Sequence, residues 1–272
     1  MSFFTIDANK CAADGLCVAE CPMGILTMDH KTPAPVEHAE ELCINCGHCV
    51  AVCPHGAFSL KTMAAAACAP VEPELLPAPE VFRRLVRSRR STRVYKNKPI
   101  EQEKLARLLD TARYAPTAKN TQQIGWLVIS RKELLEELAG KAVDWMRDLI
   151  AKKDPLATTY HMPRLVARWE EGRDPVLRSA PCLVMTHAPA DYRTGMIDST
   201  IALTTFELAA ATEGVGTCWA GFLFSAATFW PPLREALKLP AGRVITGAMM
   251  AGYPKNAYQR IPLRNEAQVI WR

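Results

Sequence analysis

Residues 43–54 read CINCGHCVAVCP, a complete C-x2-C-x2-C-x3-C-P run, and this run decides the fold of the first part of the chain. Residues 11–22, CAADGLCVAECP, repeat the run with one exception: Asp14 stands where the later run has Cys46. Three thiolates spaced two residues apart on a tight loop converge on one inorganic centre, whereas the cysteine before proline points away. The two runs therefore predict a pair of metal-binding loops.

The spacing is that of iron–sulfur ligation in bacterial ferredoxins, where the cysteine before proline serves the other cluster of a two-cluster protein. The resemblance to a two-cluster ferredoxin covers about residues 3–60. It implies two clusters, A and B, held by seven cysteines and one aspartate. Cluster B takes Cys43, Cys46, Cys49 and Cys21, and cluster A takes Cys11, Cys17, Cys53 and Asp14.

Asp14 places a carboxylate at a corner of cluster A where a thiolate would otherwise stand. A carboxylate is a harder ligand than a thiolate and binds a soft iron–sulfide corner more weakly. Cluster A is therefore expected to be a [4Fe–4S] cluster with one labile iron, or a [3Fe–4S] cluster that has lost it. The alternative is that Asp14 only caps the loop before Gly15, as Asp-Gly pairs often do in turns.

A zinc site is the competing interpretation of the cysteines. Zinc sites usually pair two C-x2-C knuckles at a distance, and they do not predict two four-position runs that each end in Cys-Pro. The pattern therefore favours iron–sulfur clusters over zinc. His48 and His55 lie next to ligand cysteines, and both are expected to be bystanders on loop surfaces.

The bulk composition is that of a soluble globular protein: 272 residues, 49% hydrophobic and 22% charged. The start, MSFFTIDANK, lacks the basic flank and apolar stretch of a secretory signal. No window approaches the roughly 18 apolar residues of a membrane span. We expect a cytoplasmic protein without a membrane partner, whose ten cysteines serve metal or redox chemistry more than disulfides.

The net charge of +5 is unevenly distributed. Residues 1–60 hold seven acidic side chains against two lysines, so the remainder is strongly basic. The basic residues of the remainder are interspersed with acids, and no Lys/Arg block with aromatic residues occurs, so nucleic-acid binding is not expected. A bound anionic cofactor would use part of the positive charge, and the acidic first part suits docking of a basic patch.

Residues 61–80 contain four prolines and six alanines and are expected to be a linker between domains 1–60 and 81–272. Beyond it an amphipathic stretch, PEVFRRLVRSRRSTR, is followed by alternating helix-like and strand-like segments. Helices are expected at 101–113, 131–153, 196–213 and 231–238, and strands at 124–130, 182–188 and 243–251. The larger part is therefore of the α+β class.

Four short signatures in the larger part resemble, in order, the nitroreductase family of FMN-dependent oxidoreductases. They are RRSTRVYKNKPI (89–100), ARYAPTAKNTQ (112–122), EGVGTCWAGF (213–222) and AGYPKNAYQRIPL (251–263). Each is weak alone, because Arg-rich and Gly-rich pieces are common, but their order across residues 83–264 is specific. The resemblance implies a nitroreductase-like fold, with a mixed sheet flanked by helices, and a homodimer that holds FMN at the subunit interface.

The resemblance also implies which residues bind FMN. Arginine binds phosphate bidentately, so the first and last signatures would hold the phosphate. The second would reach a flavin held mainly by the other subunit, and backbone N–H groups of Ala220 and Gly221 would approach the flavin edge near N5. The implied set is Arg89, Arg90, Ser91, Arg93, Pro116, Thr117, Ala118, Asn120, Trp219, Ala220, Gly221 and Arg260. Thr117 and Gln123 depart from the Ser and Pro that the family usually has there.

The remaining chemistry-bearing residues are expected to be structural. Cys182 and Cys218 lie in apolar runs and are predicted to be buried, Cys68 is a free thiol of the linker, and His187 ends a strand-like run. Segment 155–178 lies where the family places variable structure that covers the substrate. Its candidates for a pocket lining, with an exposed helix as the alternative, are Tyr160, His161, Arg168 and Trp169.

Together the two resemblances predict an iron–sulfur flavoprotein oxidoreductase. Iron–sulfur clusters pass one electron at a time, whereas FMN accepts one or two. Reduced ferredoxin or NAD(P)H would supply electrons, and a nitroaromatic, quinone or enone would accept them. No side chain need act as a nucleophile, so no catalytic residue is expected. The alternatives are an electron-transfer protein without its own small-molecule substrate and a redox sensor based on labile iron at Asp14.

Overall fold

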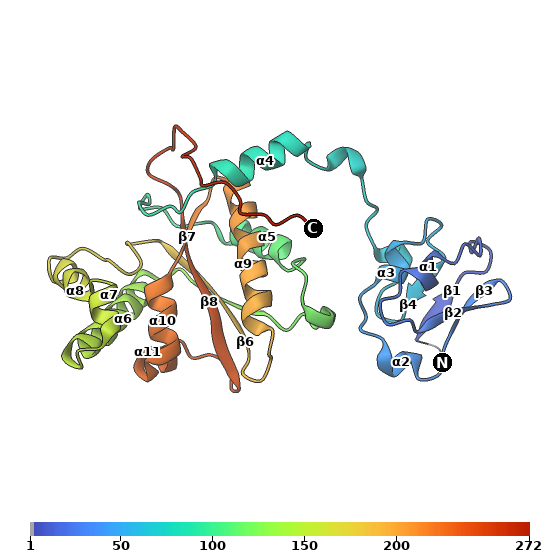
Figure 1. Ribbon diagram of the computed structural model, residues 1–272, viewed down its shortest axis with the longest axis horizontal. Coiled ribbons are helices and arrows are strands. Elements are labelled where there is room, and N and C mark those ends of the chain that lie inside the picture. Colours follow the sequence, from blue (N-terminus) through green and yellow to red (C-terminus); the bar gives the residue numbers. More distant parts are fainter. Residues whose placement is uncertain (1–2) are drawn as a thin grey trace. The chain divides into compact units, whose positions relative to one another are not determined.

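The computed structural model describes residues 3–272, and their contacts divide the chain into two units (Figure 1). The first unit extends to Leu76 and includes Thr117–Thr121, and the second comprises Pro77–Pro116 and Gln122–Arg272. Among the helices of residues 3–272, none combines the length and apolarity that crossing a membrane requires. All ten cysteines lie in the described part of the chain, and none of them forms a disulfide.

The first unit consists of short elements joined by loops. Strands β1 and β4 pair antiparallel, with Phe4 opposite Leu60, and β2 and β3 form an antiparallel hairpin. The elements are β1 (Phe4–Ile6), α1 (Leu16–Ala19), β2 (Leu26–Asp29), β3 (Thr32–Pro35), α2 (Ala39–Leu42), α3 (His48–Ala51), β4 (Phe58–Leu60), η1 (Ala65–Ala67) and η2 (Pro73–Leu75). Its core is built on stacked Phe4 and Phe58 rings, whose centroids lie 4.8 Å apart.

Helices α1 and α3 occupy equivalent places in the two cysteine runs. Gly15 precedes α1 with φ 72°, and Gly47 precedes α3 with φ 75°. Glycine takes this left-handed conformation without the steric cost that a Cβ adds. Each glycine therefore lets the chain turn sharply after the second ligand position, which starts the helix that carries Cys17 or Cys49.

The second unit is a four-stranded sheet between helices (Figure 1). The strand order is β5-β6-β8-β7, and β8 also contacts α9 and α10. The elements are α4 (Pro79–Ser88), α5 (Gln102–Ala112), β5 (Gly125–Ile129), α6 (Lys132–Ala151), α7 (Pro155–Thr159), α8 (Met162–Glu170), β6 (Cys182–Pro189), α9 (Gly195–Thr212), β7 (Gly216–Trp219), α10 (Gly221–Phe229), α11 (Pro231–Ala236) and β8 (Arg243–Gly252).

The predicted α+β class is confirmed, and the predicted helices and strands of the second unit are present with small differences at their ends. One detail was wrong: all three strand pairs of the described sheet are antiparallel, where a mixed sheet was expected. Strand periodicity places alternate side chains on opposite faces, but it carries no information about the direction of a neighbouring strand.

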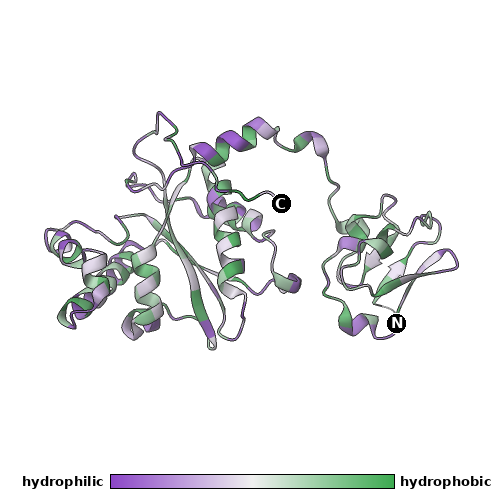
Figure 2. Cartoon of the chain, viewed as in Figure 1, coloured by the Kyte–Doolittle hydropathy of each residue, from purple (hydrophilic) through white to green (hydrophobic). Residues whose placement is uncertain are grey.

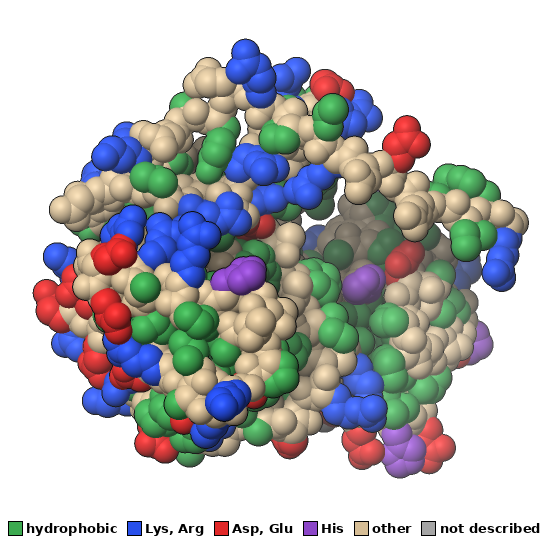
Figure 3. Space-filling view, turned by 60° about the vertical axis from the view of Figure 1, so that its left-hand side comes forward, with side chains coloured by type: hydrophobic (Ala, Val, Ile, Leu, Met, Phe, Trp, Pro, Cys, Tyr) green, Lys and Arg blue, Asp and Glu red, His purple; other side chains and the backbone are tan. Residues whose placement is uncertain are grey.

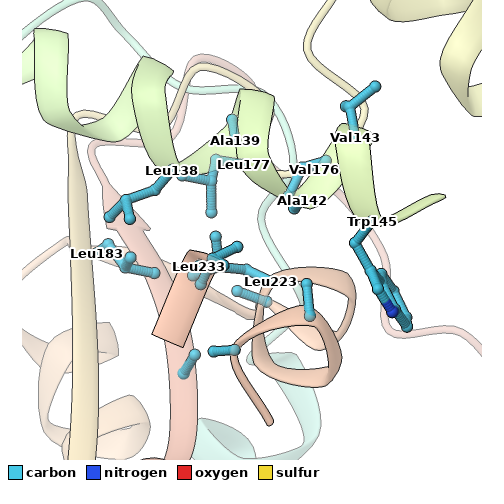
Figure 4. Packing of buried hydrophobic residues seen from close by; sticks show 14 of the residues in the cluster. Leu138, Ala139, Ala142, Val143, Trp145, Val176, Leu177, Leu183, Leu223 and Leu233 are labelled. Carbon is cyan, nitrogen blue, oxygen red and sulfur yellow. The ribbon is translucent and has the colours of Figure 1, made fainter. Parts of the chain in front are cut away.

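Alternate residues of β6 enter two separate cores. Leu183 and Met185 face the cluster covered by α6, α10 and α11, whereas Cys182 and Val184 face the cluster covered by α5 and α9. Figure 4 shows side chains of α6, α10 and the 176–177 segment meeting in the first of these clusters. Helix α10 is strongly hydrophobic along its length (Figure 2), because α6, α11 and β8 all pack against it.

Candidate cofactor sites

Two hollows in the first unit are lined by the two predicted ligand sets. Cys21, Cys43, Cys46 and Cys49 line one hollow, together with apolar residues. Cys11, Asp14, Cys17 and Cys53 line the other. In each hollow three ligand positions come from one run and the fourth from the other run, so the side chains of both predicted clusters are brought together.

The arrangement does not suit a single metal ion. Among residues 3–272, no group of three or more His, Cys, Asp or Glu side chains is close enough to ligate one ion. A structural zinc site needs four ligands on the same ion, whereas each corner of an iron–sulfur cluster binds a different iron. The two hollows therefore fit clusters better than zinc. His48 and His55 are exposed, although His48 also contributes to the rim of the first hollow.

Asp14 lies at the second hollow and also stabilises the adjacent turn. Its Oδ1 accepts a hydrogen bond from Leu16 N at 3.1 Å, at the start of α1. This is the capping role that the Asp-Gly pair indicates, and it uses one carboxylate oxygen. Because Asp14 also lines the hollow, capping and iron ligation are compatible in the same side chain.

The thiols of the hollows are held in partly buried surroundings. Burial raises the pKa of Cys49 to about 11, with the neighbouring Cys46 and Cys43 adding to the shift. Burial also raises the pKa of Cys17. Cys53 Sγ accepts a hydrogen bond from Ala57 N at 3.2 Å. A metal ligand must be deprotonated, so iron binding at these sites would release protons.

Segment 117–121 groups with the first unit. The Asn120 side chain donates a hydrogen bond from Nδ2 to the Asn45 carbonyl oxygen at 2.8 Å, within the loop between Cys43 and Cys46. Lys119 and Asn120 both have positive φ, at 52° and 53°. The Asn120 amide is thus engaged with the cluster B loop, a contact that the sequence did not indicate.

Three of the four signatures meet in the second unit. Thr92 N donates to Thr217 O at 2.8 Å, Lys96 N donates to Tyr253 O at 2.8 Å, and Lys255 N donates to Val94 O at 3.0 Å. These bonds join the first signature to β7 and to the segment after β8. Gly216 permits the approach, because an added Cβ there would lie 2.3 Å from Thr92 Oγ1.

The predicted phosphate ligands have different surroundings. Arg89 Nη1 forms an ion pair with the buried Glu207 at 2.9 Å, so its charge is already compensated. Among the described residues, no hydrogen-bond or ion-pair partner is found for the Arg90, Arg93 or Arg260 side chain. The Tyr258 hydroxyl donates to Ser91 O at 3.2 Å and brings the chain before Arg260 to the first signature. The uncompensated guanidiniums fit a phosphate group.

The second unit has a cavity of about 340 Å³. Of the predicted site residues, Arg93, Trp219 and Gly221 line it, and so does Tyr160 from segment 155–178. The flat Trp219 side chain and the cation of Arg93 are groups that an aromatic phosphate ester such as FMN would use.

One expectation about this cavity needs correction. Ala220 N donates to Ala248 O at 2.9 Å, so that N–H is used by the sheet, and Gly221 at the start of α10 is the remaining donor of the pair. Of the other candidates in segment 155–178, Trp169 packs against the core, His161 is exposed at the start of α8, and Arg168 lies within α8. Of the two alternatives for these three residues, a pocket lining is not found, since none of them lines the cavity.

Several lining residues were missed by the sequence analysis. Trp145 in α6 has the spacing of a core residue and had no distinctive signal. Phe222 ends the third signature but was not assigned to the site. Arg178 belongs to no signature. The further lining residues are Trp145, Met162, Pro175, Val176, Arg178, Cys218, Phe222, Ser225 and Met250.

The structure agrees with the predictions for the remaining residues. Cys182 and Cys218 are buried, and Cys68 is exposed. His187 accepts a hydrogen bond at Nδ1 from Arg243 Nε at 2.5 Å. Burial, and secondarily the charge of Arg243, lowers the pKa of His187. His187 is thus a neutral structural residue, as expected.

Comparison with known proteins gives two family matches. Residues 86–253 match the model of the nitroreductase family, and residues 6–57 match that of the 4Fe-4S dicluster domain. A protein of Archaeoglobus fulgidus described as an NADH dehydrogenase/NAD(P)H nitroreductase is 25% identical over 173 residues, which are 64% of this chain and 85% of that protein.

Solved structures show the same fold in the larger part. A nitroreductase with bound FMN from Bacteroides fragilis has a TM-score of 0.58 at 22% identity, covering 72% of this chain and 100% of that chain. A nitroreductase with bound FMN from Desulfitobacterium hafniense has a TM-score of 0.55 at 20% identity, covering 69% of this chain and 97% of that chain. At these identities the likeness concerns the fold.

Proposed function

Because this chain belongs to the nitroreductase family, we propose that it is an iron–sulfur flavoprotein oxidoreductase that relays single electrons from two clusters to FMN and reduces a small acceptor. The proposal depends mainly on the two hollows of the first unit. Each hollow is lined by one of the two ligand sets that the cysteine spacing predicted. The FMN-bound nitroreductases of the same fold support the choice of flavin.

When bound, the clusters would exchange one electron at a time and FMN one or two, which is the chemistry that this combination supplies. The cysteines and Asp14 would hold the clusters. Arg90, Ser91, Arg93 and Arg260 would hold the phosphate, and Gly221 would offer its N–H to the flavin edge. The role of the chain's own residues is therefore binding and orientation, and no side chain is assigned to proton transfer.

The cavity distinguishes the proposal from a pure electron carrier. An electron carrier needs a cofactor near a docking surface, and it has no use for an internal space beside the cofactor. The cavity of about 340 Å³ has the size and aromatic lining of a small-molecule site. Arg93, Trp219 and Gly221 in its wall would contact FMN, and Trp145, Tyr160 and Phe222 would line the space left for an acceptor. We therefore favour reduction of a nitroaromatic, quinone or enone over delivery of electrons to a partner protein.

We also infer a homodimer through the second unit. Its α9 exposes the apolar side chains of Met196, Ile197 and Ile201 along one side of a long helix, and the C-terminal segment exposes Ile270 and Trp271. A second copy is the occupant that would cover such surfaces in this family. Light scattering should give twice the chain mass, and Ile197→Asp should yield monomers with reduced FMN content. A wild-type monomer that retains stoichiometric FMN would contradict the dimer.

The cofactor content tests the central proposal. Protein purified without oxygen should hold about seven or eight irons and about one FMN per chain. Asp14→Cys should convert any three-iron EPR signal of cluster A into that of a four-iron cluster, whereas Cys68→Ser, a control outside both hollows, should change nothing. A preparation without sulfide and flavin would overturn the proposal.

A comparison of electron donors tests whether the clusters pass electrons to FMN. Reduced ferredoxin, NADH and NADPH should be compared as donors to wild-type protein and to the double variant Cys43→Ser/Cys46→Ser. If electrons enter through the clusters, the variant should lose donor-driven turnover of a quinone but keep turnover with chemically reduced FMN. Equal donor-driven turnover in both proteins would show that the flavin is reduced directly.

A further inference from the structure

We propose that the cavity, beside the FMN that Arg93, Trp219 and Gly221 would contact, takes a flat aromatic substrate with an anionic group, and that Arg178 recognises the anion. The proposal deepens the proposed function and rests on it, because it concerns the acceptor of the same site. Arg178 lies outside all four signatures and ends segment 155–178, where it was not among the named candidates; the structure places it in the cavity wall.

The cavity walls favour a planar ligand. Trp145 comes from α6, Tyr160 follows α7, and Trp219 and Phe222 flank the start of α10. The Tyr160 and Phe222 rings meet edge to face, with centroids 6.0 Å apart and an interplanar angle of 88°. Aromatic walls of this kind gain most from flat rings, which can stack on them or meet them edge on.

A specific turn holds Arg178 in the wall. Arg178 and Ser179 have φ values of 57° and 52°, a left-handed conformation that few residues other than glycine adopt. The Asp174 carboxylate stabilises the turn by accepting hydrogen bonds from the backbone N–H groups of Val176, Leu177 and Ser179 at 2.8–2.9 Å. Such backbone strain persists where the surroundings over-determine it, often at ligand sites.

The turn is anchored in the core. Val176 and Leu177 are 3% and 2% exposed and pack among the side chains of α6 (Figure 4). The guanidinium of Arg178 therefore extends from a rigid support, and the entropy cost of ordering it on a ligand is reduced.

The cavity is cationic. Its lining contains Arg93 and Arg178 and no Asp or Glu. Among the described residues, Arg178 has no ion-pair or hydrogen-bond partner. Burial raises the pKa of Tyr95, and the positive charges of Arg178 and Arg93 act against that shift. Figure 3 shows Lys and Arg side chains gathered over one face of the second unit.

The two cations have separable roles. Arg93 belongs to the signature that implies phosphate binding, so the cofactor would engage it. Arg178 comes from a different segment and remains available for a second anion. An arginine paired with a carboxylate forms two parallel charge-assisted hydrogen bonds, which select a planar anion such as carboxylate over a neutral group.

The test compares matched substrates in Arg178→Gln. With the holoenzyme, kcat/KM for 4-nitrobenzoate should fall about 10- to 100-fold, the worth of a charged hydrogen bond, whereas kcat/KM for methyl 4-nitrobenzoate should change less than about threefold. Arg178→Lys should retain part of the preference for the anion. The matched control, Arg164→Gln on the exposed side of α8, should change neither substrate.

A binding measurement separates this inference from the proposed function. Benzoate, which cannot be reduced, should quench the fluorescence of the cavity tryptophans and bind at least about tenfold more weakly to Arg178→Gln, whereas benzamide should bind both proteins equally. If no nitroaromatic turns over but benzoate still depends on Arg178, the anion subsite stands and the proposed acceptor class fails. If nitroaromatics are reduced without any preference for charge, the subsite fails.

Two further outcomes would overturn the inference. Loss of FMN from Arg178→Gln, with the melting temperature unchanged, would assign Arg178 to the cofactor phosphate. Equal losses of kcat/KM for the acid and its ester would show that Arg178 only supports the shape of the cavity.

Discussion

The first unit has a core of nine buried residues and helices of four residues, whereas the larger core of the second unit has 26 buried residues and is covered by α6, a helix of 20 residues. Small domains bury too little apolar surface to balance their loss of chain entropy, and they usually need disulfides or metals. The first unit has no disulfide. From this difference we expect bound clusters to stabilise the first unit, and the second unit to fold through its own core.

The largest expected effect comes from removing the cluster ligands. In Cys43→Ser/Cys46→Ser the first unit should lose most of its stability, because metal-binding energy is folding energy in such domains. Hydrogen exchange should show loss of protection across 3–60 and unchanged protection in the strands of the second unit. Cys68→Ser, an exposed cysteine outside the hollows, is the control. Simultaneous loss of protection in β6 and β8 would mean that the two units fold as one.

A smaller effect tests whether the second unit is held by its own side chains. Arg89→Met removes the cation that pairs with the Glu207 carboxylate, which is 8% exposed and keeps the hydrogen bond from the Thr217 hydroxyl. The free energy of unfolding of FMN-free protein should fall by about 3 kcal/mol, the lower end of the cost of breaking a buried ion pair, because Arg89 is 23% exposed. Arg107→Met, which breaks the more exposed pair with Glu213, should cost under about 1 kcal/mol.

The double variant Arg89→Met/Glu207→Leu completes this test. Removing both charges should recover most of the loss, because an apolar pair avoids the desolvation penalty. If the double variant is as unstable as Arg89→Met alone, the cost lies in packing and the charge pair contributes little. FMN content measured on the same proteins would show separately whether Arg89 also serves the phosphate.

Packing within the sheet gives the next prediction. A Cβ at Gly125 would lie 2.2 Å from Cε1 of the His187 ring, across the β5–β6 pair. Gly125→Ala should therefore destabilise the second unit by about 1–3 kcal/mol in denaturant unfolding. Gly140→Ala is the matched control: it lies within α6, its nearest outside atom would be 3.5 Å away, and alanine should stabilise the helix by about 0.5–1 kcal/mol.

The sequence predicted local features better than long-range ones. The cysteine runs indicated both ligand sets because the spacing within a loop and the exchange of the fourth ligand are properties of the motif. The four signatures indicated the family, but not that Thr92 would meet Gly216, because that contact joins segments more than 120 residues apart. Helix α10 was missed, since a helix covered on several sides lacks a 3.6-residue apolar period.

The cavity shows most clearly which site residues the sequence could not predict. Arg93, Trp219 and Gly221 were found through the signatures, whereas Arg178 and Trp145 were not. Arg178 reaches the wall through a left-handed turn organised by Asp174, and a turn of this kind has no periodic signal. Ala220 was chosen for its place in a signature, but its N–H is taken by β8, a pairing that only the fold determines.

The smallest expected effect is the pH dependence of the second unit. His187 Nδ1 accepts its bond from Arg243, so protonation of the ring would break that bond and place two cations together. Burial, with a contribution from Arg243, lowers the pKa of His187 below its ordinary value of 6.5. Because the unfolded state binds the proton more readily, stability is greatest above pH 6.5 and decreases as the pH falls from there toward the folded-state pKa.

His187→Gln keeps an acceptor without a titratable ring, so between pH 7.5 and 5.5 its melting temperature should decrease less than that of wild type. Comparing the two proteins cancels the titration of other groups, including the cysteines of the first unit. Identical decreases would show that His187 does not control the acid sensitivity of the second unit.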